Sequence, residues 1–102
     1  MITESEFLGQ VIDLAHIYGW KCVHFRPAMT SKGWRTAVQA DGKGFPDLFM
    51  IRENRIIFAE LKSDNGKLSS EQVDWLNALQ PVGEVFIWKP EDFEQIIDIL
   101  KH

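Results

Sequence analysis

Three stretches of the chain carry apolar residues at the spacing of an amphipathic helix. The first runs from a capping-box pattern at Thr3 to Gly19, and the second runs from a similar pattern at Ser69 to Pro81. The third begins at Pro90, a residue type that suits the first turn of a helix. The sequence therefore predicts three helices, one near each end of the chain and one between them.

Shorter apolar stretches between these helices are typical of β-strands. They cover residues 21–25, 46–51, 55–62 and 84–88, and a segment without either periodicity covers residues 27–44. The order is helix, strand, loop, hairpin, helix, strand, helix (α-β-β-β-α-β-α). This order predicts an α/β fold in which a small mixed β-sheet is flanked by helices.

Length and composition narrow the class of protein. The chain has 102 residues, so we expect residues 1–102 to form one domain. A composition of 45% apolar and 25% charged residues excludes a disordered or collagen-like chain, and no apolar run is long enough to span a membrane. Glu4 and Glu6 lie where a leader peptide would be basic, so we expect a cytoplasmic protein. The single cysteine, Cys22, excludes an internal disulfide and a cysteine-based zinc cluster.

Positive charge is concentrated in one part of an acidic protein. The net charge is −4, yet residues 20–45 carry five cations against the one acid Asp41, a local charge of +4. Most of these cations lie in the irregular segment 27–44, and irregular segments of this length are usually functional. The side chains with the donors needed to hold phosphates are Arg26, Lys32, Arg35 and Lys43. The alternative is that these cations belong to a solvated loop.

The two central strands are separated by a short polar tip at residues 53–54, which favours a tight hairpin. If the chain turns there, Phe49 faces Phe58 and Asp47 faces Glu60. An odd-length turn would shift this register by one residue. The sequence thus predicts two carboxylates in facing positions at one end of the hairpin.

Facing carboxylates need a compensating charge. Side chains alternate along a strand, so Lys62 shares a face with Glu60. Opposed Cβ atoms are about 5 Å apart, where two like charges repel by roughly 3 kcal/mol at most. A divalent cation shared by Asp47 and Glu60 would offset this cost, and Mg²⁺ prefers such oxygen ligands. The alternative is that Glu60 and Lys62 form a solvated pair at the end of their strand, and that Asp47 is only a turn residue after Pro46.

Three sequence segments in this order resemble a known family. They read GFPDLFMI, which contains Asp47, then IIFAELKS, which contains Glu60 and Lys62, then GKLSSEQVDWL. Together they resemble the virus-type replication-repair nuclease (VRR-NUC) branch of the PD-(D/E)XK superfamily, from the first helix to Trp88. The resemblance implies a restriction-endonuclease-like fold and an Mg²⁺-dependent endodeoxyribonuclease, with Mn²⁺ as a substitute. The segment 27–44 is longer than the minimal family pattern, which bears on substrate preference.

The resemblance also implies a substrate and an assembly. Members that consist of the bare domain are phage or bacterial proteins, so the implied location is the cytoplasm of a bacterial or phage-infected cell. They cut branched DNA, including Holliday junctions, as homodimers, and two symmetric cuts in a four-way junction also call for a dimer. Two alternatives are a DNA-binding module that does not cleave, and a nuclease for nicks, flaps or particular sequences.

Roles for individual residues follow from the resemblance. It implies that Asp47, Glu60 and the carbonyl of Leu61 bind the metal, and that Lys62 positions or activates the attacking water. It also implies a glutamate on the first helix, and Glu4 is the candidate that shares a stripe with apolar residues of that helix.

Two of these roles have alternatives. Glu4 and Glu6 both favour a helix N-terminus electrostatically, which would explain them without any site. Gln72 either caps the helix at Ser69 or points towards the metal site, as the matching glutamine of the family suggests.

Overall fold

The computed structural model describes residues 2–25, 28–30, 33–35, 40–63 and 66–102. Its elements, in chain order, are α1 (Glu4–Ile17), β1 (Lys21–His24), β2 (Ala28–Thr30), β3 (Gly33–Arg35), β4 (Leu48–Arg52), β5 (Arg55–Leu61), α2 (Ser70–Leu79), β6 (Glu84–Trp88), the 3-10 turn η1 (Pro90–Asp92) and α3 (Phe93–Lys101). In the described residues, no helix is both long and apolar enough to cross a membrane.

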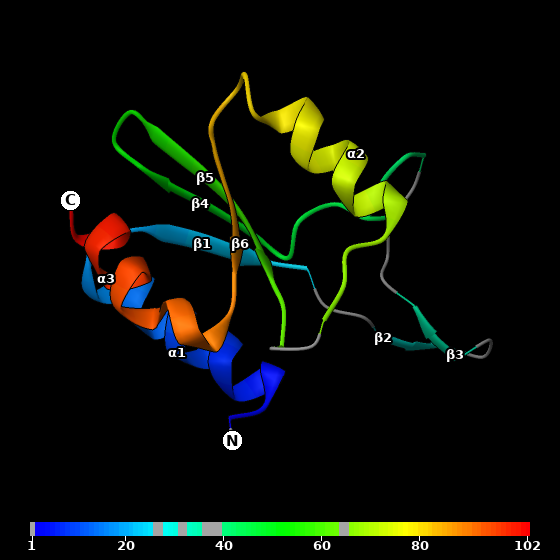
Figure 1. The fold of residues 1–102 in the computed structure, drawn as a ribbon, viewed down its shortest axis with the longest axis horizontal. Coiled ribbons are helices and arrows are strands. Elements are labelled where there is room, and N and C mark those ends of the chain that lie inside the picture. The colour runs from blue at the N-terminus through cyan, green and yellow to red at the C-terminus, as the bar shows by residue number, and fades with distance from the viewer. Residues whose placement is uncertain (1, 26–27, 31–32, 36–39, 64–65) are drawn as a thin grey trace.

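A four-stranded sheet in the order β1-β4-β5-β6 forms the centre of the fold (Figure 1). The β1–β4 and β4–β5 pairs are antiparallel, whereas β6 pairs with β5 in parallel after the crossover through α2. Figure 1 shows α1 and α3 together on one side of the sheet and α2 on the other. The predicted small mixed sheet flanked by helices is confirmed.

The main core lies between the sheet and the pair α1 and α3. Because side chains alternate along a strand, β4 and β5 send every second residue into this core. Its fully buried members include Phe7 and Val11 from α1, Met50 from β4, Ile57 from β5 and Ile96 from α3. The opposite face of the hairpin, which carries Glu60, turns towards α2.

Both predicted capping boxes are present. The hydroxyl of Thr3 accepts the Glu6 N–H (3.0 Å), and the hydroxyl of Ser69 accepts the Gln72 N–H (3.2 Å). In each case the side chain of the third helical residue returns a bond to the cap backbone. The chain leaves α1 through Gly19, whose φ of +83° is readily available only to glycine.

The hairpin has the predicted register. Phe49 pairs with Phe58 and Ile51 pairs with Ile56. Strand β4 begins at Leu48, two residues later than the apolar pattern indicates. The reason is local: Pro46 has no N–H to give to a ladder, and the N–H of Asp47 bonds to a side chain instead.

One prediction about the chain between β1 and β4 is wrong. Residues 27–44 do not lack regular structure throughout, because β2 and β3 form a two-stranded antiparallel ribbon in which Met29 pairs with Trp34. Strands of three residues are too short to show an alternating pattern. Figure 1 shows this ribbon standing away from the central sheet.

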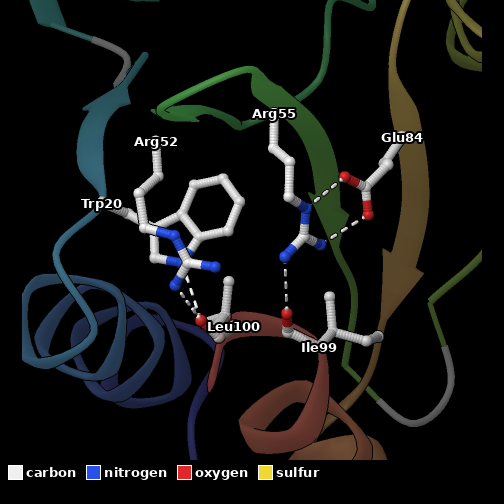
Figure 2. Close-up of polar contacts among 6 residues, drawn as sticks. All are labelled: Trp20, Arg52, Arg55, Glu84, Ile99 and Leu100. Atoms are coloured by element: carbon white, nitrogen blue, oxygen red, sulfur yellow. Dashed lines mark hydrogen bonds and ion pairs between the residues drawn. The ribbon is translucent and has the colours of Figure 1, made fainter. Parts of the chain in front are cut away.

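The tip of the hairpin is tied to the end of α3 by a cluster of polar contacts (Figure 2). The guanidinium carbons of Arg52 and Arg55 lie 4.6 and 5.0 Å from the ring centroid of Trp20. The carbonyl of Leu100 accepts bonds from Trp20 Nε1 (2.9 Å) and Arg52 Nη1 (2.7 Å), and Arg55 forms a two-bond ion pair with Glu84. These contacts satisfy carbonyls at the helix C-terminus, where cations are favoured.

Candidate active site

Asp47 and Glu60 meet at the end of the hairpin opposite its tip. The N–H of Asp47 donates to Glu60 Oε1 (3.1 Å), and the N–H of Leu61 donates to Asp47 Oδ2 (2.9 Å). Glu60 is only 2% exposed, a rare position for a carboxylate. Each carboxylate is therefore held in its facing position by a backbone N–H of the opposite side of the hairpin, Glu60 by that of Asp47 and Asp47 by that of Leu61.

Two further side chains reach Glu60. The ammonium of Lys62 lies 3.7 Å from Glu60 Oε2, and Gln72 Nε2 donates a hydrogen bond to the same oxygen. Gln72 Oε1 meanwhile accepts the N–H of Ser69 (2.8 Å). The two alternatives for Gln72 are thus not exclusive, because one amide caps α2 with its oxygen and holds Glu60 with its nitrogen.

This setting raises the pKa of Glu60 from 4.5 to about 7. Burial is the largest cause, followed by the negative charge of Asp47 and a hydrogen bond between the two carboxyl groups. The positive charge of Lys62 acts in the opposite direction. A strongly shifted carboxyl group with a specific charged neighbour is a common mark of a functional site.

The donor set fits a hard divalent cation. Carboxylate oxygens are the ligands that Mg²⁺ uses in proteins, and one or two carboxylates suffice when water completes the coordination. Asp47 also lines a cavity of about 390 Å³ together with Glu4, His24 and Leu61. In the described part of the chain, no three histidine, cysteine or acidic residues gather closely enough to form a metal site without such further ligands.

The two glutamates of α1 occupy different positions. Glu6 closes the capping box at Thr3, which commits its side chain to the helix terminus. Glu4 lines the cavity that Asp47 also lines, although it does not join Asp47 and Glu60 in a three-acid cluster. The role of Glu4 as a metal ligand stays a prediction.

Two of the four predicted DNA-binding residues lie in the part of the chain that the structure describes. Arg26 and Lys32 fall outside the described residues, and Arg35 is the last residue of β3. Lys43 precedes β4, with its side chain 81% exposed and its ammonium 3.9 Å from Glu71. A surface ion pair of this length contributes little, so it leaves Lys43 free to contact another partner.

Sequence reasoning did not select Gly44 or Phe25, although both support the site. The N–H of Phe25 donates to the carbonyl of Asp47 (3.1 Å), which extends the β1–β4 pairing to the acid pair. Gly44 has a φ of +85°, and a Cβ there would lie 2.7 Å from the backbone of α2 at Glu71. The sequence does hold a signal for Gly44: a glycine just before the Phe-Pro-Asp turn often marks a left-handed or crowded backbone position.

The fold and the site together define a small α/β domain with a lysine-flanked acidic pair at a strand end. The family model of the VRR-NUC domain matches residues 14–86, which is well over half of the chain. The chain therefore belongs to the VRR-NUC family, and it is a nuclease domain. The matched range includes Asp47, Glu60, Lys62 and Gln72, whereas Glu4 lies before it. Neither the curated proteins nor the solved structures gave a match.

Proposed function

We propose that this protein is a Mg²⁺-dependent endonuclease that cuts branched DNA, with Holliday junctions as the leading substrate. The observation that carries the proposal is the pairing of Asp47 with the buried Glu60 beside Lys62, in a chain of a nuclease family. The acid pair lies at the open end of a hairpin whose register is set by a two-residue turn.

The chemistry of phosphodiester hydrolysis suits these groups. Asp47 and Glu60 would hold the cation, with the Leu61 carbonyl and Glu4 as additional oxygen ligands, and Mn²⁺ would substitute for Mg²⁺. The bound cation would supply Lewis acidity and lower the pKa of water. The ammonium of Lys62, 3.7 Å from Glu60, orients the attacking water and stabilises the charge that develops on the phosphate. Gln72 keeps the Glu60 carboxylate in place from α2.

The surroundings of the acid pair favour a DNA substrate. Phe25 donates its N–H to the carbonyl of Asp47, and four of the five cations of the segment 20–45 follow Phe25 in the sequence. Phosphates bound along this segment would lie next to the acids. A projecting basic ribbon beside the site suits a substrate with more than one helical arm. Two symmetric cuts in such a junction would require a homodimer.

Cleavage assays on a supercoiled plasmid and a labelled four-way junction test the proposal. We expect cutting with Mg²⁺ or Mn²⁺ and none in chelator. Asp47→Ala, Glu60→Gln and Lys62→Ala should each abolish cutting and leave junction binding largely intact. Glu53→Gln, which removes a carboxylate at the far end of the same hairpin, is the matched control and should cut normally.

The same assay separates the alternatives. Retained cutting by Glu60→Gln at saturating Mg²⁺ would overturn the assigned roles. Junction binding without cutting at any metal concentration would instead indicate a DNA-binding module on a nuclease fold. Faster cutting of duplexes with a nick, a flap or a particular sequence than of junctions would show that such a duplex, and not a junction, is the substrate.

A further inference from the structure

Phe25 presents an exposed aromatic ring next to the acid pair. The residue is 42% exposed, although its backbone N–H is fixed to the carbonyl of Asp47 at 3.1 Å. Continued by one residue past the ends of β1 and β4, the register of the sheet places Phe25, Asp47 and Glu60 in one row, on the face that carries α2. A large apolar side chain is thus exposed beside the two carboxylates, although hydrolysis of a phosphodiester does not itself require an apolar group there.

The ring is held in a fixed position from behind. Phe25 and Phe45 meet edge to face, with ring centroids 5.5 Å apart at 88°. Phe45 in turn meets Phe58 at 6.0 Å and Trp75 at 5.1 Å, also edge to face. Edge-to-face contacts of this kind stabilise a ring orientation. The cluster therefore fixes the ring of Phe25 at the surface, which reduces the entropy that a bound ligand must remove.

We propose that Phe25 stacks on an unpaired nucleobase beside the cleaved phosphate, and so makes the enzyme favour DNA whose bases are exposed at a branch. The proposal rests on the proposed function and deepens it. In a continuous duplex each base face is covered by its neighbours, whereas a base at a branch or in a single-stranded arm offers a free face. A base hangs from the sugar next to its phosphate, so a phosphate at Asp47 brings its base within reach of Phe25.

The position favours a base over a protein partner. Val23, on the same face, is also exposed at 48%, but it pairs with Phe49 and lies two register positions further from the acids. The residues that follow Phe25, 26–45, carry four cations against one acid, a charge of +3, which suits a nucleic-acid backbone and not an apolar protein surface. An aromatic ring beside a basic segment is the common design of single-strand binding surfaces.

Fluorescence anisotropy with the full chain tests the stacking directly. The probes are two labelled duplexes with a single-stranded arm, one of thymidines and one of abasic residues, in Ca²⁺ instead of Mg²⁺. Both arms carry the same phosphates, so their difference in affinity reports contact with bases. We expect the wild type to prefer the thymidine arm by about 5- to 150-fold, the range for loss of one aromatic stack.

Variants then assign the preference to the ring. Phe25→Ala should bind both arms equally, and Phe25→Trp should keep the preference. Phe25→Leu retains apolar contact with Phe45 without an aromatic face, so it should also lose the preference while melting close to the wild type. Val23→Ala is the matched control on the same strand and should behave as the wild type.

Each result decides between outcomes. A preference that survives in Phe25→Ala and Phe25→Leu, or an equal loss of affinity for both arms, would overturn the stacking role. A shift from dimer to monomer in Phe25→Ala, seen by sedimentation, would overturn it in favour of a subunit contact. If the wild type cuts DNA but prefers neither arm, this inference fails and the proposed function stands. If the wild type prefers the thymidine arm but cuts no DNA in Mg²⁺, the stacking role of Phe25 stands and the proposed nuclease function fails.

Discussion

Replacing Asp47 with asparagine tests the facing carboxylates without any substrate. Asparagine keeps the size of the side chain and an oxygen able to accept the Leu61 N–H, which now donates to Asp47 at 2.9 Å. It removes the negative charge opposite Glu60 and offers an N–H to that carboxylate. We therefore expect Asp47→Asn to stabilise the protein in chelator at a pH where Glu60 is ionised.

The pKa of Glu60 sets the size and the pH range of the effect. Its rise from 4.5 to about 7 means that the folded state binds the proton more tightly than the unfolded state. Stability from this group is fully present below pH 4.5 and is lost as the pH rises through about 7. One pKa unit is about 1.4 kcal/mol, so the wild type loses at most roughly 3.5 kcal/mol over this range. Burial is the main cause and persists in the variant.

Asp47→Asn should therefore recover only part of this loss, roughly 0.2–1 kcal/mol, the usual size of a cross-strand pair. Thermal unfolding in chelator measures it, and a gain of this size raises the Tm by roughly 1–8 °C in a domain of this length. The gain should be present at pH 8 and absent at pH 5. Asp13→Asn, an exposed acid on α1, controls for the loss of one charge.

Magnesium should reverse the order of the two proteins. At 100 times its dissociation constant, a ligand bound only by the folded state adds about 2.7 kcal/mol, which exceeds the relieved repulsion. The wild type should gain this and the variant much less. If Asp47→Asn is destabilising in chelator at pH 8, and magnesium shifts both melting temperatures equally, the facing pair does not control the site and our reasoning is refuted.

Three further predictions concern the rest of the domain. Gly44→Ala should lower the free energy of unfolding by roughly 1–3 kcal/mol in urea, because a positive φ and a 2.7 Å approach to α2 both oppose a Cβ; an unchanged midpoint would contradict this packing. Arg55→Ala should lower the free energy of unfolding by roughly 1 kcal/mol, because it removes the ion pair with Glu84. Arg55 lowers the pKa of Glu84, and the stability that comes from a lowered carboxyl pKa is lost as the pH falls through that pKa. The cost of Arg55→Ala should therefore shrink at acidic pH. Replacing Lys32, Arg35 and Lys43 together should flatten the slope of log affinity against log salt for junction DNA, and an unchanged slope would place the DNA surface elsewhere.

The sequence predicts the central hairpin well because its signals are local. A two-residue polar tip allows few turn geometries, and in the structure Glu53 adopts a φ of 54° in this turn. The length of the turn sets the register of the two strands, and the register brings Asp47 opposite Glu60. The capping boxes are equally local, since each needs only two side chains one helical turn apart. These short-range features carry most of the candidate site.

Features that depend on tertiary contact were not predictable in the same way. The ribbon β2–β3 consists of three-residue strands, too short for any period to show. The joint role of Gln72 needed the position of α2 over β5, and no spacing along the chain gives that position. The contacts of Arg52 and Arg55 with α3 join residues more than forty positions apart, where a sequence pattern carries no signal.

The shared amide of Gln72 ties the first turn of α2 to the acid pair. Its oxygen holds the Ser69 N–H and its nitrogen holds Glu60, so fraying of this turn must also release Glu60 from one of its partners. In native-state hydrogen exchange, the amides of Ser69 and Gln72 should then open together with the site and not as a free helix end. A helix terminus, usually the most weakly protected part of a helix, thus becomes an internal reporter of whether the acidic residues are in place.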